Sequence, residues 1–475
     1  MRALSTTAPL AAVPPAAVLP GAVRPPVHSP RTLALLQAPI LRTLLRLAGP
    51  NVLVMLAQSS TGLIEAHFVG RLGTPALAGM ALVFPGIMLM QMMSSGAMGG
   101  GIASAIARAL GAGRRGEADL LALHAMAISL GLGLLFCAAG LLVGPVLYCA
   151  MGGDGAALAA ALKYSNVVFA GAVLVWGFNG LASCIRGTGD MLAPALVICG
   201  GALVLVPLSP CLIFGWGPFP ALGVAGGGVA LLLYYAVGGT ILAVYLCGAR
   251  AGVRLRLHPL RWAPLWAILR VRMLASLITI QTNLVVTLTT AFAGGFGAAA
   301  IAGYGAGSRL EFLLVPLVFG LGAPLIALVG ANLGAGQRDR ALRVAWVGAG
   351  VAFVMTEVIG LAGAAWPSAW LGLFGQDPAM LAAGAAYLRA TGPFFGFFGG
   401  GMALYFASQG AGRLAWPLAS AVLRMGVAVG GGWLALQLTG SLQAVFLALG
   451  AGLLALGLGN AAAVAGGAWF KGDRA

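Results

Sequence analysis

Residues Arg42 to Gly73 read RTLLRLAGPNVLVMLAQSSTGLIEAHFVGRLG. The stretch can cross a bilayer as a helix, because about 20 predominantly apolar residues are enough. It carries one carboxylate, Glu65, and a charged group inside a membrane is costly and therefore usually functional. Asn51, Gln58 and Glu65 recur every seven residues, a step that returns to nearly the same helix face. The pattern predicts a membrane helix with a polar stripe that ends at an acid.

The composition of the whole chain is that of a helical membrane protein. Hydrophobic residues make up 60% of the 475 residues and charged residues 8%, unlike any soluble domain of this size. The apolar runs are continuous over about 20 residues or more, which favours helices over a β-barrel. The net charge of +16 lies mainly on arginines between these runs, so membrane topology explains it better than nucleic-acid binding. The six cysteines form no CxxC motif, and we interpret them as buried apolar residues.

Twelve candidate spans follow an Ala- and Pro-rich segment, residues 1–38, that we expect to be a disordered extension. Arginines gather in alternate connections between the spans, and the intervening connections are nearly uncharged. The positive-inside rule then places both termini in the cytoplasm, for a multi-pass protein of the bacterial inner membrane. The expected spans are roughly 44–69, 76–106, 119–149, 160–184, 191–214, 222–247, 264–293, 298–331, 341–373, 380–406, 415–438 and 442–469.

The two halves of the chain repeat each other. Three pairs of similar segments occur in the same order, shifted by 224, 223 and 223 residues: 70–79 with 294–303, 107–118 with 330–341, and 185–194 with 408–417. Six spans per repeat return the chain to the same side, so the repeats run parallel about an axis along the membrane normal. We therefore expect an N-lobe at 39–249, a linker at 250–263 and a C-lobe at 264–470.

Several motifs together resemble the multidrug and toxic compound extrusion (MATE) family. They are the first span with its FVGRLG end, GAGRRGEA at 111–118, NGLASCIRGTGD at 179–190, the 305–337 stretch with LVGANLGAG, and ASQGAGR at 407–413. The resemblance covers about 40–470 and implies a V-shaped pair of six-helix bundles. It also implies export of organic, often cationic compounds by antiport with Na⁺ or H⁺.

The resemblance assigns the coupling site to the N-lobe, as in the DinF-like branch of the family. There an acid in the position of Glu65 acts with an Asn and an Asp. Asn179 matches the Asn, but Ser183 stands in place of the Asp. In the NorM-like branch the coupling carboxylate lies on the seventh span, where this chain has Gln281, an amide that does not titrate.

Glu65 is therefore our candidate coupling residue. Burial disfavours the charged carboxylate, so this group can bind and release a proton. Na⁺ is the other candidate ion, with oxygen ligands from Gln58, Thr61, Asn179 and Ser183. The alternative is a solvated Glu65 at the outer helix end, neutralised beside His67 and Arg71.

Other polar or adaptable side chains lie within the expected spans. Arg309 and Glu311 are two residues apart, so they do not face each other on a helix, and Glu357, Arg389 and Arg424 are candidate partners. We interpret them either as structural ion pairs or, at Glu311 or Glu357, as a second proton site. Candidates for the wall of a substrate cavity are Asn51, Gln281, Thr282, Thr289, Met92 and Tyr405; for the threonines, helix–helix contacts are an equal alternative.

These observations predict a monomeric secondary transporter that exports small amphipathic, cationic compounds in exchange for H⁺ or Na⁺. Its partners would be those compounds and the lipid bilayer, with no nucleic acid, no structural metal and no cofactor besides the coupling ion. A lipid-linked oligosaccharide flippase is the alternative, because the intramembrane arginines could meet a diphosphate. An intramembrane enzyme is disfavoured, because the chain has no HExxH or catalytic-dyad pattern at suitable spacing.

Overall fold

The computed structural model describes residues 29–151, 154–248, 252–255, 277–278, 281–282, 284–286 and 288–470. Every regular element in these ranges is a helix. By length and apolar composition nine described helices could each cross a membrane, and the bent pair α6–α7 makes ten. The expected seventh span, 264–293, and the 250–263 linker lie mostly outside the described residues. The expected tenth span is α14 (Pro378–Thr391) and α15 (Phe395–Ala411), joined by a 3₁₀ turn.

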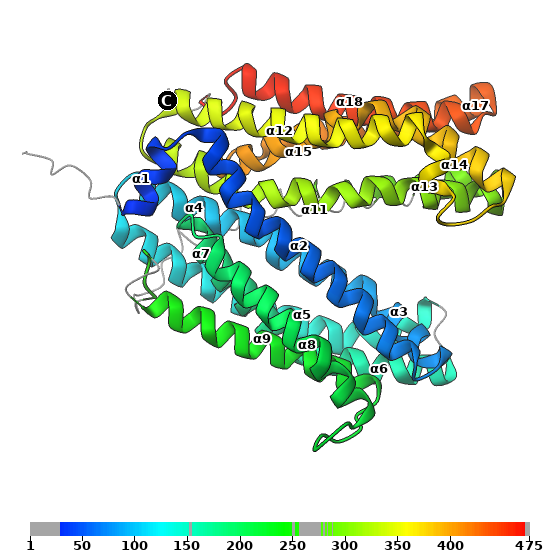
Figure 1. Cartoon of the computed structure of the whole chain (residues 1–475), viewed down its shortest axis with the longest axis horizontal. Helices are drawn as coiled ribbons and strands as arrows, with labels where there is room; N and C mark the ends of the chain where they lie inside the picture. Colours follow the sequence, from blue (N-terminus) through cyan, green and yellow to red (C-terminus); the bar gives the residue numbers. More distant parts are fainter. Residues whose placement is uncertain are drawn as a thin grey trace, which may run out of the picture.

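The helices form two bundles, as predicted (Figure 1). After α1 (Pro30–Gln37), the first bundle contains α2 (Ile40–Gly70), α3 (Thr74–Gln91), a π-helical turn (Met92–Met98), α4 (Gly99–Gly111), α5 (Arg115–Ala150), α6 (Gly155–Ala170), α7 (Ala172–Gly187), α8 (Leu192–Phe214) and α9 (Val224–Cys247). The second contains α11 (Ala298–Gly334), α12 (Arg338–Ala365), α13 (Pro367–Leu371), α14, α15, α16 (Ala415–Met425), a π-helical turn (Gly426–Gly430), α17 (Gly431–Thr439) and α18 (Leu442–Ala465).

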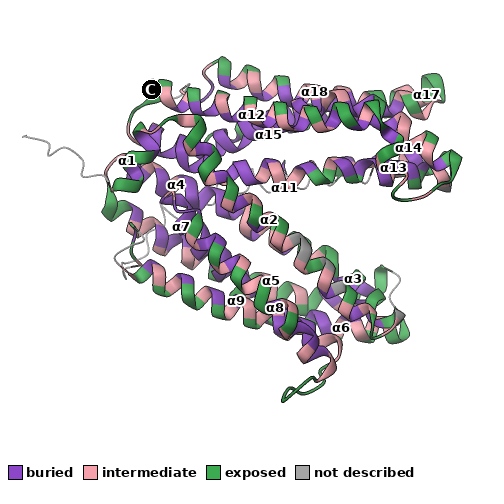
Figure 2. Cartoon of the chain, in the orientation of Figure 1, coloured by how far each residue is buried: buried purple, intermediate pink, exposed green. Residues whose placement is uncertain are grey.

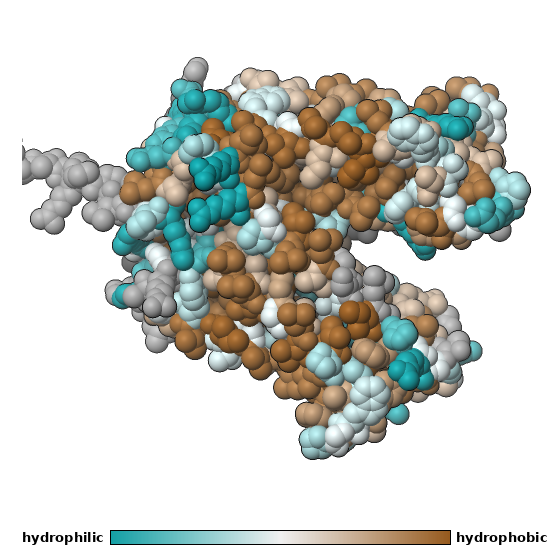
Figure 3. Space-filling model, in the orientation of Figure 1, coloured by the Kyte–Doolittle hydropathy of each residue, from teal (hydrophilic) through white to brown (hydrophobic). Residues whose placement is uncertain are grey.

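The bundles meet at the end that carries α1 and diverge toward the other end (Figure 1). Buried residues gather where α4, α7, α11 and α15 come together (Figure 2). In the space-filling view a hollow separates the two arms at the open end, and hydrophobic residues form a broad band between more hydrophilic ends (Figure 3). This band is what a bilayer requires of a multi-pass protein. The all-helical, two-lobed membrane fold expected from the sequence is thus confirmed.

Two glycines allow the lobes to touch through their backbones. A Cβ atom on Gly111 of α4 would overlap the carbonyl oxygen of Ala331 on α11, and one on Gly334 would overlap that of Arg108. Gly111 and Gly334 are repeat equivalents, as are Arg108 and Ala331, both at a shift of 223. The crossing is therefore symmetric, and glycine is required because small residues let membrane helices approach closely.

The expected disordered extension is wrong for its last residues. Pro30–Gln37 form helix α1, whose N-cap Ser29 accepts a hydrogen bond from the Thr32 N–H at 3.1 Å. Ser at the N-cap followed by Pro at the first helical position is a strong helix start. Leu35 and Leu36 are buried in the core cluster of the C-lobe, so apolar burial holds the segment in place. Residues 1–28 lie outside the described residues.

Candidate cation-coupling site

Glu65 lies in a buried position where three helices of the N-lobe meet. Its carboxylate, on α2, accepts a hydrogen bond at Oε1 from the Tyr164 hydroxyl of α6, at 2.9 Å. On α9, Gly227 leaves room for it, because a Cβ atom there would lie 2.9 Å from Oε1. Glu65 is only 9% exposed, so it is not the solvated helix-end carboxylate of our alternative interpretation. His67 and Arg71, in contrast, are exposed.

None of the other expected ligands has a described hydrogen bond to Glu65, whose described partner is Tyr164. The Thr61 hydroxyl donates to the Ala57 carbonyl of its own helix at 2.8 Å, and Gln58 is half-buried about two turns before Glu65. Asn179 and Ser183 lie on α7, where the Ser183 hydroxyl donates to the Asn179 carbonyl at 2.7 Å. Glu65 and the four residues expected to bind a cation with it are therefore not joined by hydrogen bonds into one site in the described part of the chain. The spacing of polar residues along one helix predicts which of them share a face. It does not predict which residues of neighbouring helices pack against that face.

Asn179 belongs to a second polar cluster, beside the π-helical turn. Its Nδ2 donates to the Ser94 hydroxyl at 2.9 Å and to Gln91 Oε1 at 3.3 Å. The Gln91 amide in turn donates to the Tyr235 hydroxyl of α9. A polar track thus leads from Tyr235 through Gln91 to Asn179. Breaks of this π type occur frequently at functional sites.

Sequence reasoning missed four members of this site: Tyr164, Tyr235, Gln91 and Ser94. Each is a polar side chain within an apolar span, which is a signal in itself. Tyr164 had a second signal, because the repeat places Tyr387 at the equivalent position of the C-lobe, with a shift of 223.

Asn51 joins the lobes instead of lining a cavity. Its Nδ2 donates to the carbonyl oxygens of Phe319 and Gly320 on α11, at 3.2 and 3.1 Å. The reason lies in Pro324, which has no N–H to donate to the carbonyl four residues earlier. The Gly320 carbonyl is therefore free within its helix, and the amide of Asn51 satisfies it across the lobe boundary.

The remaining cavity candidates have varied surroundings. Thr282 and Thr289 donate to carbonyls of their own helix at 2.9 and 2.8 Å, and Met92 is exposed. Gln281 is buried, and its amide has no hydrogen-bond partner among the described residues. Tyr405 is buried in the core cluster of the C-lobe, with its ring against Phe406. Its aromatic ring gains more from packing inside the bundle than from facing water.

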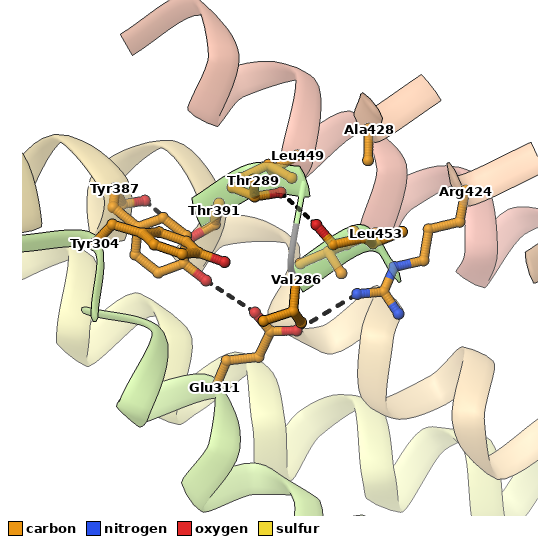
Figure 4. A pocket seen from close by; sticks show the side chains of 11 residues that line it. Val286, Thr289, Tyr304, Glu311, Tyr387, Thr391, Arg424, Ala428, Leu449 and Leu453 are labelled. Carbon is orange, nitrogen blue, oxygen red and sulfur yellow. Dashed lines mark hydrogen bonds and ion pairs between the residues drawn. The ribbon is translucent and has the colours of Figure 1, made fainter. Parts of the chain in front are cut away.

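The C-lobe contains a second carboxylate within its membrane helices, the half-buried Glu311 of α11 (Figure 4). The Tyr387 hydroxyl of α14 donates to Oε2 at 2.8 Å, and Nη2 of Arg424 on α16 lies 3.6 Å from Oε1. The pocket around them encloses about 30 Å³, and Thr289, Tyr304 and Thr391 also line it. The partnership of Glu311 with Arg424 that we considered from the sequence is confirmed.

Arg309 and Glu357 do not join Glu311. Arg309 is exposed, and its guanidinium lies over the Phe374 ring at 5.0 Å. Glu357 accepts the backbone N–H of Gly396 at 2.6 Å, and Arg389 is exposed. The three residues of the expected second site, Arg309, Glu311 and Glu357, therefore share no partner among those described.

Comparison with known proteins gives the family. The family model MatE matches residues 50–211 and 275–434, one stretch in each lobe. The chain belongs to the MATE family. It is 29% identical to a protein of Shewanella oneidensis named FAD transporter, over 73% of this chain and 77% of that one. It is 26% identical to a probable multidrug resistance protein NorM of Thermotoga maritima, over 78% and 79%.

Solved MATE structures have the same fold. A MATE transporter in a bent conformation superposes with a TM-score of 0.83 at 24% identity, over 91% of this chain and 96% of that one. An outward-facing MATE transporter gives a TM-score of 0.81 at 24% identity, with the same coverage. This MATE protein is therefore a multi-pass membrane transporter, and the two matched stretches agree with the internal repeat.

Proposed function

We propose that this MATE transporter exports small amphipathic, cationic organic compounds in exchange for protons, with Glu65 as the group that exchanges the proton. The observation that carries the proposal is the buried Glu65 carboxylate, which has one tyrosine donor and lies inside a membrane helix. Organic cations are proposed because the relatives of this chain include multidrug resistance proteins.

The surroundings of Glu65 favour a proton over Na⁺. A bare Na⁺ needs several oxygen ligands, whereas the Asn179 amide donates to the Ser94 hydroxyl and the Ser183 hydroxyl donates to the Asn179 carbonyl. The Tyr164 hydroxyl stabilises the ionised carboxylate through one charge-assisted hydrogen bond. Protonation removes the charge that is costly to bury. The exchange of one proton thus changes the balance of charge inside the N-lobe.

Alternating access follows from the open and closed ends of the molecule. A proton that enters from the open side neutralises Glu65 and favours release of the exported compound there. The lobes then close at that end and part at the other, where the proton leaves and a new compound binds. The hydrogen bond from Tyr164 joins Glu65 to α6, so a change of charge at Glu65 reaches a second helix of the N-lobe.

We assign the closed end to the cytoplasm of a bacterial inner membrane. The arginine-rich connections lie there, at Arg114, Arg115, Arg338 and Arg340. Helix α1 and the end of α18 lie at the same end (Figure 1). The positive-inside rule places such an end inside the cell, so the structure is open toward the outside.

A flavin dinucleotide is the second candidate substrate, because one relative is named an FAD transporter. It differs from an organic cation in carrying two negative phosphates. A lipid-linked oligosaccharide would likewise carry a diphosphate. The charge of the exported compound therefore separates the candidates.

The experiment is transport into everted membrane vesicles that contain the wild-type protein, with pH and Na⁺ gradients imposed separately. We expect a pH gradient to drive uptake of a cationic dye and a Na⁺ gradient to leave it unchanged. Uptake of FAD without dye uptake would establish the second candidate. Uptake driven by Na⁺ alone would contradict the assignment of the proton.

A further inference from the structure

The internal repeat places a tyrosine at the same point in both lobes. Tyr164 and Tyr387 are separated by the repeat shift of 223 and are 1% and 2% exposed. Their surroundings repeat as well: Gly79 packs on Ala157 and Ala161, and Gly303 packs on Met380 and Gly384, the equivalent residues. Each hydroxyl donates to a carboxylate, at 2.9 Å to Glu65 and at 2.8 Å to Glu311.

The two carboxylates come from different helices. Glu65 lies on α2, whose repeat equivalent in the C-lobe has Thr289 at this point, with a shift of 224. Glu311 lies on α11, and its equivalent 223 residues earlier is Met88 on α3. Thr289 and Glu311 line the same C-lobe pocket. Both lobes thus hold a tyrosine–carboxylate pair, although the acid is supplied by a different helix.

The lobes differ in the cation beside the pair. Arg424 lies 3.6 Å from Glu311, and its side chain is only 8% exposed. In the described part of the chain, Glu65 has no basic side chain within ion-pair distance. The N-lobe equivalent of Arg424 is Gly201, and a Cβ atom there would already contact the Tyr234 ring at 2.6 Å. A long basic side chain therefore has no room at that position.

We propose that Arg424 is a tethered counterion that occupies the cation position of the C-lobe tyrosine–carboxylate pair, so that Glu65 alone exchanges an ion. The proposal rests on the function proposed for Glu65. The Arg424 side chain is 8% exposed and that of Glu311 is 22% exposed, so little solvent replaces the guanidinium when it is removed. A carboxylate in such a site that loses its ionic partner is destabilised while it stays charged. Without Arg424, Glu311 takes up a proton in its place. The pocket of about 30 Å³ has room for about one water molecule.

The test counts the protons bound by the purified protein, so it does not require transport. We expect Arg424→Met to bind one proton more than the wild type in a titration from about pH 5 to about pH 9, a range above the ordinary pKa of a carboxyl group. Infrared difference spectra should show a new protonated carboxyl. Both signals should vanish in Glu311→Gln/Arg424→Met, and Arg424→Lys, which keeps a tethered cation, should match the wild type.

An Arg424→Met protein that binds no extra proton and shows no new carboxyl band overturns the proposal. Should that variant fail to fold, Glu311→Gln decides, because it keeps Arg424 and a hydrogen-bond acceptor for Tyr387. A tethered counterion predicts that Glu311→Gln binds as many protons as the wild type, and the loss of one proton overturns it. Failure of the proposed function would appear elsewhere, as unchanged proton binding and coupling in Glu65→Gln.

Discussion

At the scale of single residues, the candidate site depends on one hydrogen bond between helices that are distant in sequence. Glu65 is identifiable from the sequence because a lone acid within an apolar span stands out. Its partner is not identifiable in the same way, since Tyr164 lies 99 residues further along the chain. The seven-residue period of α2 indicated a polar face but not the helices against it. Asn51 on that face consequently meets α11, whereas Glu65 meets α6.

Tyr164→Phe removes the hydroxyl donor and keeps the ring. A buried acceptor that loses its donor costs about 1–3 kcal/mol, so we expect proton-driven transport to fall about tenfold. Transport rates in proteoliposomes at several external pH values measure this, with protein amount normalised by quantitative blotting. A rate equal to that of the wild type at every pH would show that this hydrogen bond does not matter for coupling.

Gly227→Ala places a methyl group 2.9 Å from Oε1 of Glu65. Overpacking of this kind costs about 1–3 kcal/mol, so we expect about tenfold slower transport and a shifted pH dependence. Gly239→Ala on the same helix is the matched control, because nothing lies within 4 Å of a Cβ atom there. The prediction fails if the two variants transport equally well.

At the scale of elements, α1 connects the two lobes at the closed end. Nη1 of Arg31 lies 2.8 Å from Oδ2 of Asp190 in the N-lobe. On the other side, Asn332 of α11 donates to the Leu35 carbonyl at 3.2 Å. Burial lowers the pKa of Arg31, but its hydrogen bond to Tyr245 and the charge of Asp190 outweigh that effect and leave the pKa raised. The pair therefore keeps its positive partner throughout the accessible pH range, and salt is the better probe of it.

Arg31→Gln should loosen the closed end, because α1 loses its ion pair with Asp190 of the N-lobe while its hydrogen bond to the C-lobe remains. A partly exposed ion pair contributes up to about 1 kcal/mol, so we expect the closed end to open about fivefold more often. The readout is alkylation of a cysteine introduced at Ala105, in a cavity of about 350 Å³ at the lobe junction, with the native cysteines replaced. Arg42→Gln, at an exposed position of α2, is the charge-matched control. Equal alkylation rates in both variants would contradict the role of α1.

At the scale of the whole molecule, the sequence was sufficient for the two lobes and their parallel repeat. Long apolar runs and arginine-rich connections are properties of whole segments. They can therefore be recognised even where the bounds of a helix are misplaced by a few residues. The sites were less predictable, because they depend on which side chains reach across helix boundaries. Glu311 and Glu65 show this, since the repeat places their tyrosines correctly but supplies the two acids from non-equivalent helices.

Gly111→Ala should weaken the symmetric crossing of the lobes, because the added methyl group would overlap the Ala331 carbonyl. We expect a shift of about 1–3 kcal/mol toward the state that is open at this end. Distances between spin labels on the two lobes can measure the populations. Gly334→Ala should act in the same way, whereas Gly116→Ala, with nothing within 4 Å of its Cβ atom, should not. Unchanged distance distributions in both crossing variants would refute this account of closure.

The central claim is that Glu65 couples transport to the proton gradient. Glu65→Gln keeps a similar shape and an acceptor for Tyr164 but cannot exchange a proton. The decisive measurement compares this variant with the wild type in proteoliposomes, as substrate counterflow without a gradient and as accumulation driven by a pH gradient. We predict that counterflow persists in Glu65→Gln while gradient-driven accumulation is lost. Accumulation that still follows the pH gradient in Glu65→Gln would contradict the claim.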